Sequence, residues 1–158
     1  MNNLETGKSQ DKKNNPTYLV IKCGNSKINH ASQELDAVLR KNEIGWFAKF
    51  GAKINFKELS KKINSEGVVL CLSLFIDGKF HLFGYEVIEF KEQININKDP
   101  FPSYYQEFLP QAKTWICVKK LEDQAMPRLE ELIVKSSLNP ILQALRTSTA
   151  GFFLCRKK

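Results

Sequence analysis

The chain has 158 residues, which is long enough for one domain with its own core and too short for two. Hydrophobic residues make up 42% of it and charged residues 26%, as in ordinary soluble globular proteins, and no apolar run approaches the roughly 20 residues of a membrane helix. The net charge is +7 and no apolar signal segment opens the chain, so we expect a cytoplasmic protein without a membrane partner.

The first 16 residues are polar and predict a flexible tail, which leaves residues 17–158 as a single domain. The β-branched, apolar run TYLVIKCG predicts a strand that ends at Gly24. A helix is expected to follow, with Asn29 as its N-cap and its end near Lys41.

Residues 43–54, EIGWFAKFGAKI, mix aromatic and basic side chains in a segment that we expect to be extended. A capping-box pattern at Asn55 and Glu58 predicts the start of a short helix. The clearest local signal is the Asp-Gly pair at 77–78 between two apolar runs, which favours a tight β-hairpin. The apolar alternation of the second run slips near Gly84, which predicts a β-bulge there.

Residues 91–110 are rich in proline and aromatic side chains and predict a long loop, after which TWICVKKL predicts a strand. MPRLEEL is typical of a short helix, Asn139 and Pro140 predict the start of a last helix, and GFFLCRKK predicts a closing strand. Together these elements predict an α+β domain in which a curved, barrel-like mixed sheet is flanked by short helices.

Positive charge is concentrated in one part of the chain. Between Lys22 and Lys62, nine basic residues stand against four acidic ones, which leaves a charge of +5, whereas the 96 residues after Lys62 carry about +1. Such a concentration is expected of a phosphate-binding face, although a lysine-rich solvated surface would explain the charge alone equally well.

Residues that would indicate catalysis or a metal are not grouped in the sequence. The four cysteines stand singly, whereas metal sites usually pair them roughly two to four residues apart, so we expect reduced, mostly buried thiols and no cofactor. No phosphate-binding loop, dinucleotide fingerprint or nucleophile elbow is present, and neither His30 nor His81 has a partner at a telling spacing. The sequence therefore gives no positive reason for an enzyme.

Several segments, taken in order, resemble the YTH domains. TYLVIKCGNSKIN followed by GWFAKFGAKINFKELSKKI is similar to the start of that family, VVLCLSLFIDGKFHLFGYEVI to its hairpin, and KTWICVKKLED to a later strand. The related EVE domains share this PUA-like barrel, and some open modification-dependent restriction proteins of the McrB type. The resemblance covers roughly Tyr18 to Asp123.

The resemblance implies a PUA-like fold and a nucleic-acid-binding module that holds a modified base, in particular a methylated one, in an aromatic cage. The base would be single-stranded or extruded from a duplex. The implied partners are DNA or RNA and, in a restriction system, a motor or nuclease subunit or domain.

The resemblance also implies site residues. The cage aromatic falls on Trp46 by residue type and on Phe47 by strict spacing, and the loop after the hairpin offers a second wall. The strand-end run that hydrogen-bonds the nucleotide falls on residues 22–25, where Cys23 replaces a serine of the family, so a reader of methyladenine is not preserved intact. The predicted base-binding residues are Trp46, Phe47, Cys23, Asn25, Phe101, Tyr104 and Tyr105, and the predicted phosphate-binding residues are Lys22, Lys27, Lys49 and Lys53.

Because Trp46 and Phe47 are adjacent in a strand, we expect one ring in the core and the other facing a pocket. Phe50 and Trp115 are expected in the core. Two alternatives stay open. One is a PUA-fold enzyme of the ASCH type that acts on RNA or nucleotides, with Lys22 and Tyr104 as acid or base groups. The other is a protein-interaction domain that docks a partner through its aromatic loop.

Overall fold

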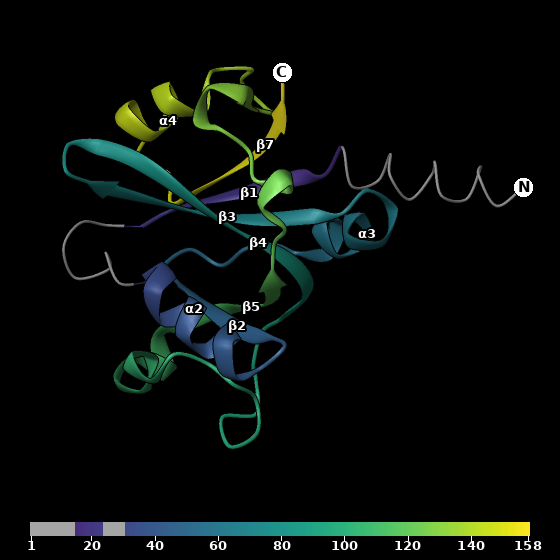
Figure 1. Ribbon diagram of the computed structural model, residues 1–158, viewed down its shortest axis with the longest axis vertical. Coiled ribbons are helices and arrows are strands. Elements are labelled where there is room, and N and C mark those ends of the chain that lie inside the picture. Colours follow the sequence, from purple (N-terminus) through teal and green to yellow (C-terminus); the bar gives the residue numbers. More distant parts are fainter. Residues whose placement is uncertain (1–14, 24–30) are drawn as a thin grey trace, which may run out of the picture.

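The computed structural model describes residues 15–23 and 31–158, and in them seven strands form one mixed sheet accompanied by three α-helices (Figure 1). The strands are β1 (Thr17–Lys22), β2 (Gly45–Phe50), β3 (Val68–Ile76), β4 (Lys79–Lys91), β5 (Ala112–Lys120), β6 (Leu132–Val134) and β7 (Phe152–Lys157). The α-helices are α2 (Ala31–Lys41), α3 (Lys57–Ser65) and α4 (Ile141–Thr147), and the 3-10 helices are η1 (Ser103–Gln111), η2 (Asp123–Ala125) and η3 (Leu129–Glu131).

The strand order in the sheet is β2-β5-β4-β3-β1-β7-β6. Strand β1 runs parallel to β3 and antiparallel to β7, and the other described pairs are antiparallel, so the sheet is mixed. Figure 1 shows β1, β3 and β7 in the upper half of the molecule and β2 and β5 in the lower half. The predicted α+β class is confirmed, but β2 and β6 are separate edges, so the described sheet is not closed into a barrel.

Both faces of the central strands are buried. Alternate residues of a strand point to opposite faces, so each central strand contributes side chains to two cores. Leu19 of β1 and Leu70 of β3 belong to a main core, which also receives side chains of α2 and α3. Val20 and Cys71 belong to a second core on the other face, where α4 contributes Ile141, Ala144 and Leu145. This double burial explains why the TYLVIK and VVLCLSLFI runs are apolar at almost every position.

The predicted hairpin is confirmed and the predicted bulge is wrong. Asp77 and Gly78 have φ of 51° and 77°, the positive values that a tight type I′ turn requires. Gly84 pairs regularly with Cys71, and the irregular register lies between Val87 and Glu89. Glycine occupies position 84 for a different reason, since a Cβ there would lie 2.5 Å from the sulfur of Met126.

The helix starts also differ from the predictions. Helix α3 begins after Phe56, which has no capping side chain, and Asn55 Oδ1 accepts a hydrogen bond from the N–H of Lys57 at 3.4 Å, so the capping box is wrong. Helix α4 begins at Ile141 with Pro140 at the N-cap position, one residue later than predicted. The long loop contains η1, and the predicted cap of α2, Asn29, lies outside the described residues. None of the described helices combines the length and the apolar character needed to span a membrane.

Candidate nucleic-acid interface

Aromatic side chains from three segments far apart in sequence pack together beside β2. We call Phe47, Phe50, Phe101, Tyr105 and Trp115 the aromatic cluster. The ring centroid of Tyr105 lies 6.3 Å from Phe47, 5.6 Å from Phe50 and 5.9 Å from Trp115, and Phe101 lies 5.6 Å from Trp115. All four contacts are edge-to-face, the favoured geometry for aromatic pairs. The structure thus brings together the predicted base-binding residues Phe47, Phe101 and Tyr105.

The rings of Trp46 and Phe47 are both buried, with exposed fractions of 3% and 5%. The expectation that one of them faces an open pocket is therefore not met. Helix α2 packs against β2. The backbone N–H of Trp46 donates to the carbonyl of Pro100 at 2.9 Å, and the ring of Tyr105 contacts that of Phe47. Cover from both sides leaves neither ring at the surface.

The indole of Trp46 carries a donor that the fold does not use. Its Nε1 is buried and has no hydrogen-bond partner among the described residues. The ammonium of Lys91 lies 5.4 Å from the centroid of the ring, and Lys91 also pairs with Glu89 at 3.4 Å. Leaving a buried donor unsatisfied costs about 1–3 kcal/mol, so an acceptor atom of a ligand would be favoured at this position.

Lys49 is a buried cation. Its side chain is 5% exposed, and its Nζ donates to the carbonyls of Phe50 and Ala52 at 3.0 and 2.9 Å. The ring of Phe152 lies 5.4 Å from the same nitrogen. Lys49 takes part in none of the ion pairs among the described residues, and the third N–H of its ammonium has no acceptor there. Burial accordingly lowers the pKa of Lys49.

The segment from Ser148 to Phe152 places Lys22 and Lys49 near each other. Lys22 donates its backbone N–H to the carbonyl of Gly151 at 2.9 Å and its Nζ to the carbonyl of Ser148, also at 2.9 Å. A Cβ on Gly151 would lie 3.7 Å from Nζ of Lys49. Sequence reasoning gave this segment no role, because nothing local in it signals a contact with strands more than a hundred positions earlier.

The other predicted site residues are engaged differently. Lys53 forms an ion pair with the exposed Glu92. Cys23 is buried, and its N–H donates to the carbonyl of Ser73 at 3.0 Å. Burial raises the pKa of the Cys23 thiol to about 12, so it is not a reactive thiolate. Asn25, Lys27 and the side chain of Tyr104 lie outside the described part of the chain.

The cysteines are buried as predicted, and all four are free. In the described ranges no group of three or more His, Cys, Asp or Glu side chains is arranged to hold a metal ion.

We compared the chain with protein-family models, with curated proteins and with solved structures. None of the three comparisons found a match. The function therefore has to be argued from the site itself, whose central features are the aromatic cluster, the indole N–H of Trp46 and the buried ammonium of Lys49.

The lowered pKa of Lys49 predicts a pH-dependent stability. Between that lowered pKa and the ordinary value of 10.5, the unfolded chain binds more protons than the folded one, so stability rises with pH. We expect the free energy of unfolding of the wild type, relative to Lys49→Met, to increase as the pH rises through this window. Urea denaturation of both proteins at several pH values measures it. Equal pH slopes would contradict the burial of a charged Lys49.

Proposed function

We propose that this chain is a nucleic-acid-binding module of the PUA-like type, related in character to YTH and EVE domains. We propose that it holds a modified base, in particular a methylated one, that is single-stranded or extruded from a duplex. The observation that carries the proposal is Lys49, a buried ammonium with no carboxylate partner among the described residues. Buried charges in proteins are paired, so an anion is expected to complete this site.

A nucleic-acid phosphate is the anion that the surroundings of Lys49 favour. Lys49 lies on the same strand as Trp46 and Phe47, three and two residues after these buried rings. Phosphate contacts position a nucleic acid, while contacts to the base specify it. Lys49 would serve the first purpose and the aromatic residues the second. The mixed α+β sheet is consistent with the PUA-like class.

The aromatic cluster supports the base-binding part of the proposal. Stacking one base on an aromatic ring is worth about 1–3 kcal/mol, and burying an added methyl group contributes about 0.8 kcal/mol more. The rings of the cluster pack against one another, so a base would have to displace a ring. Phe101 is only half-buried and comes from the segment between β4 and β5, so we propose that it yields to the base. The indole Nε1–H of Trp46 would then donate to an acceptor of the base.

Fluorescence titration tests the proposal, because Trp46 and Trp115 both lie at the site. Short single- and double-stranded oligonucleotides, with and without methylated adenine or cytosine, would be added at two salt concentrations. We expect quenching that favours one modified base and weakens with salt. Trp46→Phe keeps an aromatic ring and removes the N–H, so it should weaken binding roughly 2- to 10-fold, the worth of one uncharged hydrogen bond.

Absence of binding to every oligonucleotide at low salt would contradict the proposal and favour the protein-interaction alternative. Binding without preference for any modified base would leave a general nucleic-acid binder. If the preference is found, a modification-dependent restriction system is the setting we propose, with a motor or nuclease subunit or domain supplying the cleavage.

A further inference from the structure

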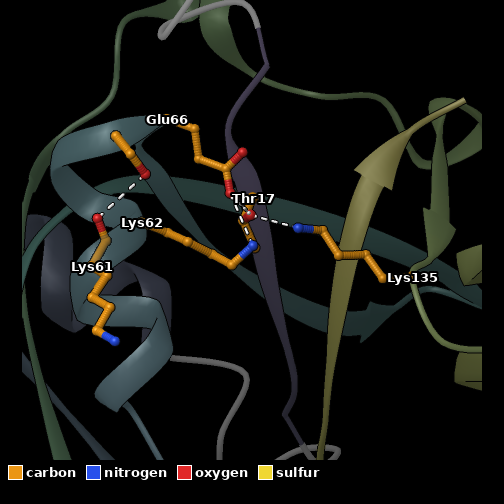
Figure 2. Close-up of polar contacts among 6 residues, drawn as sticks. Thr17, Lys61, Lys62, Glu66 and Lys135 are labelled. Carbon is orange, nitrogen blue, oxygen red and sulfur yellow. Dashed lines mark hydrogen bonds and ion pairs between the residues drawn. The ribbon is translucent and has the colours of Figure 1, made fainter.

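A second group of polar residues lies at the opposite end of β1 from Lys22. Figure 2 shows Thr17, Lys62, Glu66 and Lys135, which we call the two-lysine cluster. Thr17 Oγ1 donates to Glu66 Oε1 at 2.9 Å and accepts from Lys135 Nζ at 2.7 Å. Lys62 Nζ donates to the same carboxylate oxygen at 3.1 Å. The hydroxyl group of Thr17 thus joins Glu66 to Lys135, which is 118 positions after Thr17.

The backbone holds these side chains in place. The N–H of Thr17 donates to Gly67 O at 3.0 Å, and the N–H of Lys135 donates to Leu154 O at 2.8 Å. The N–H of Glu66 donates to Lys62 O at 2.9 Å at the end of α3. Thr17 is fully buried and donates to Glu66, so the oxygen atoms that accept from Lys135 and Lys62 are fixed in position.

Positive charge exceeds negative charge in the cluster. Lys62, Lys135 and the nearby Arg156 contribute three positive charges against the carboxylates of Glu66 and the nearby Glu58, which leaves an excess of one. Burial and then the charge of Lys62 lower the pKa of Lys135, and Arg156 acts in the same direction. Each ammonium has three N–H groups; one from each is donated to a described oxygen, and the two lysine side chains also lie within hydrogen-bond reach of each other.

A groove begins beside the cluster. Its volume is about 540 Å³, within the range of small-molecule sites. Its lining includes Glu66 of the cluster and Pro16, the neighbour of Thr17, but neither Lys62 nor Lys135. The rest of the lining is mainly apolar, and its charged residues are Glu86, Lys119 and Glu122.

We propose that Lys62 and Lys135 bind the phosphate of a phosphate monoester whose remaining part lies in this groove. A phosphate monoester carries about 1.5 to 2 negative charges at neutral pH and three strong acceptor oxygens, which two neighbouring ammonium groups can share. A nucleoside monophosphate and the phosphorylated end of an oligonucleotide share this chemistry, and the groove takes the nucleoside in either case.

Isothermal titration calorimetry on the full chain tests the site. The four probes are a nucleoside 5′-monophosphate, the same nucleoside without phosphate, and a short oligonucleotide with and without a 5′-phosphate. We expect the two phosphorylated probes to bind more tightly than their partners without phosphate. Lys135→Gln should weaken the binding of the phosphorylated probes about 10- to 150-fold, as for the loss of a charge-assisted hydrogen bond.

Lys61→Gln is the matched control. Lys61 precedes Lys62 on α3, its side chain is 67% exposed, and its ammonium points away from the cluster (Figure 2). Lys61→Gln removes the same charge as Lys135→Gln, but outside the cluster. The affinity for the phosphorylated probes should therefore change less than twofold. Equal losses from Lys135→Gln and Lys61→Gln, or equal binding of probes with and without phosphate, would overturn the proposal.

Thermal unfolding separates binding from a purely structural role. Wild type, Lys135→Gln and Lys62→Gln would be melted with and without the monophosphate. We expect the monophosphate to raise the Tm of the wild type more than that of either variant. Equal shifts in all three would assign the cluster to structure alone and overturn the proposal. Should Lys135→Gln fail to fold, Lys62→Gln carries the same test.

The two-lysine cluster does not include Lys49. Loss of modified-base binding with retained monophosphate binding would therefore refute only the proposed function.

Discussion

Trp46→Ala is expected to lower the free energy of unfolding by about 3–5 kcal/mol, the usual effect of removing a buried tryptophan ring. The ring is 3% exposed and belongs to the main core. Against a typical total stability of about 5–15 kcal/mol, this loss would leave the variant marginally folded. Urea denaturation followed by circular dichroism measures it.

Phe75→Ala is a suitable control, because this ring is 45% exposed near the tip of the hairpin. We expect it to cost about 1 kcal/mol or less. If Trp46→Ala costs no more than Phe75→Ala, the ring of Trp46 is not part of the core, and an open cage that presents it to solvent becomes the better interpretation. The same result decides which variant suits binding studies, since a loss of binding in an unfolded Trp46→Ala protein would carry no information.

Lys49→Gln is expected to weaken oligonucleotide binding about 10- to 150-fold, because one charge-assisted hydrogen bond to a phosphate is lost in a buried site. The dependence of log K on log salt should also become shallower by about one. Fluorescence titration at several salt concentrations gives both quantities. The ring of Phe152 and the carbonyls of Phe50 and Ala52 surround the side chain, so few other groups can take over the contact.

Lys79 serves as a control for Lys49, because it lies exposed beside the hairpin turn. Lys79→Gln removes the same charge as Lys49→Gln, and we expect an affinity change below about threefold, as for exposed charges. Equal losses at both positions would mean that net charge alone drives binding, and Lys49 would lose its assigned role.

Features set by neighbouring residues were predictable from the sequence. The Asp-Gly pair at 77–78 predicted the hairpin because only a few residue types accept positive φ at both turn positions. The apolar runs that became β1 and β3 predicted strands for an equally local reason. The bulge was misplaced because Gly84 packs closely against Met126, a contact that no local pattern reveals.

Features set by distant contacts were not predictable in the same way. The burial of Lys49 is not visible in GWFAKF, because part of its surroundings, Phe152 and Gly151, lies far away in the sequence. In the sequence Lys62 and Lys135 are indistinguishable from ordinary surface lysines. Their association depends on the hydrogen bonds of Lys62 to Glu66 and of Lys135 to Thr17. The resemblance to YTH domains selected aromatic residues that do converge, but the exposure of each ring depends on how the segment from Pro100 to Tyr105 covers β2.

The position of β1 has a consequence for how the chain folds as it is synthesised. β1 leaves the ribosome first among the strands, yet one of its two partners is β7, the last of them to be made. The apolar edge of β1 and the residues of the second core stay uncovered until residues 152–157 are available. Pairings between such distant segments form slowly, and exposed strand edges invite aggregation in the meantime. This sheet should therefore be completed only after β7 has been synthesised, and its folding should benefit from chaperones that cover the exposed edge of β1 until then.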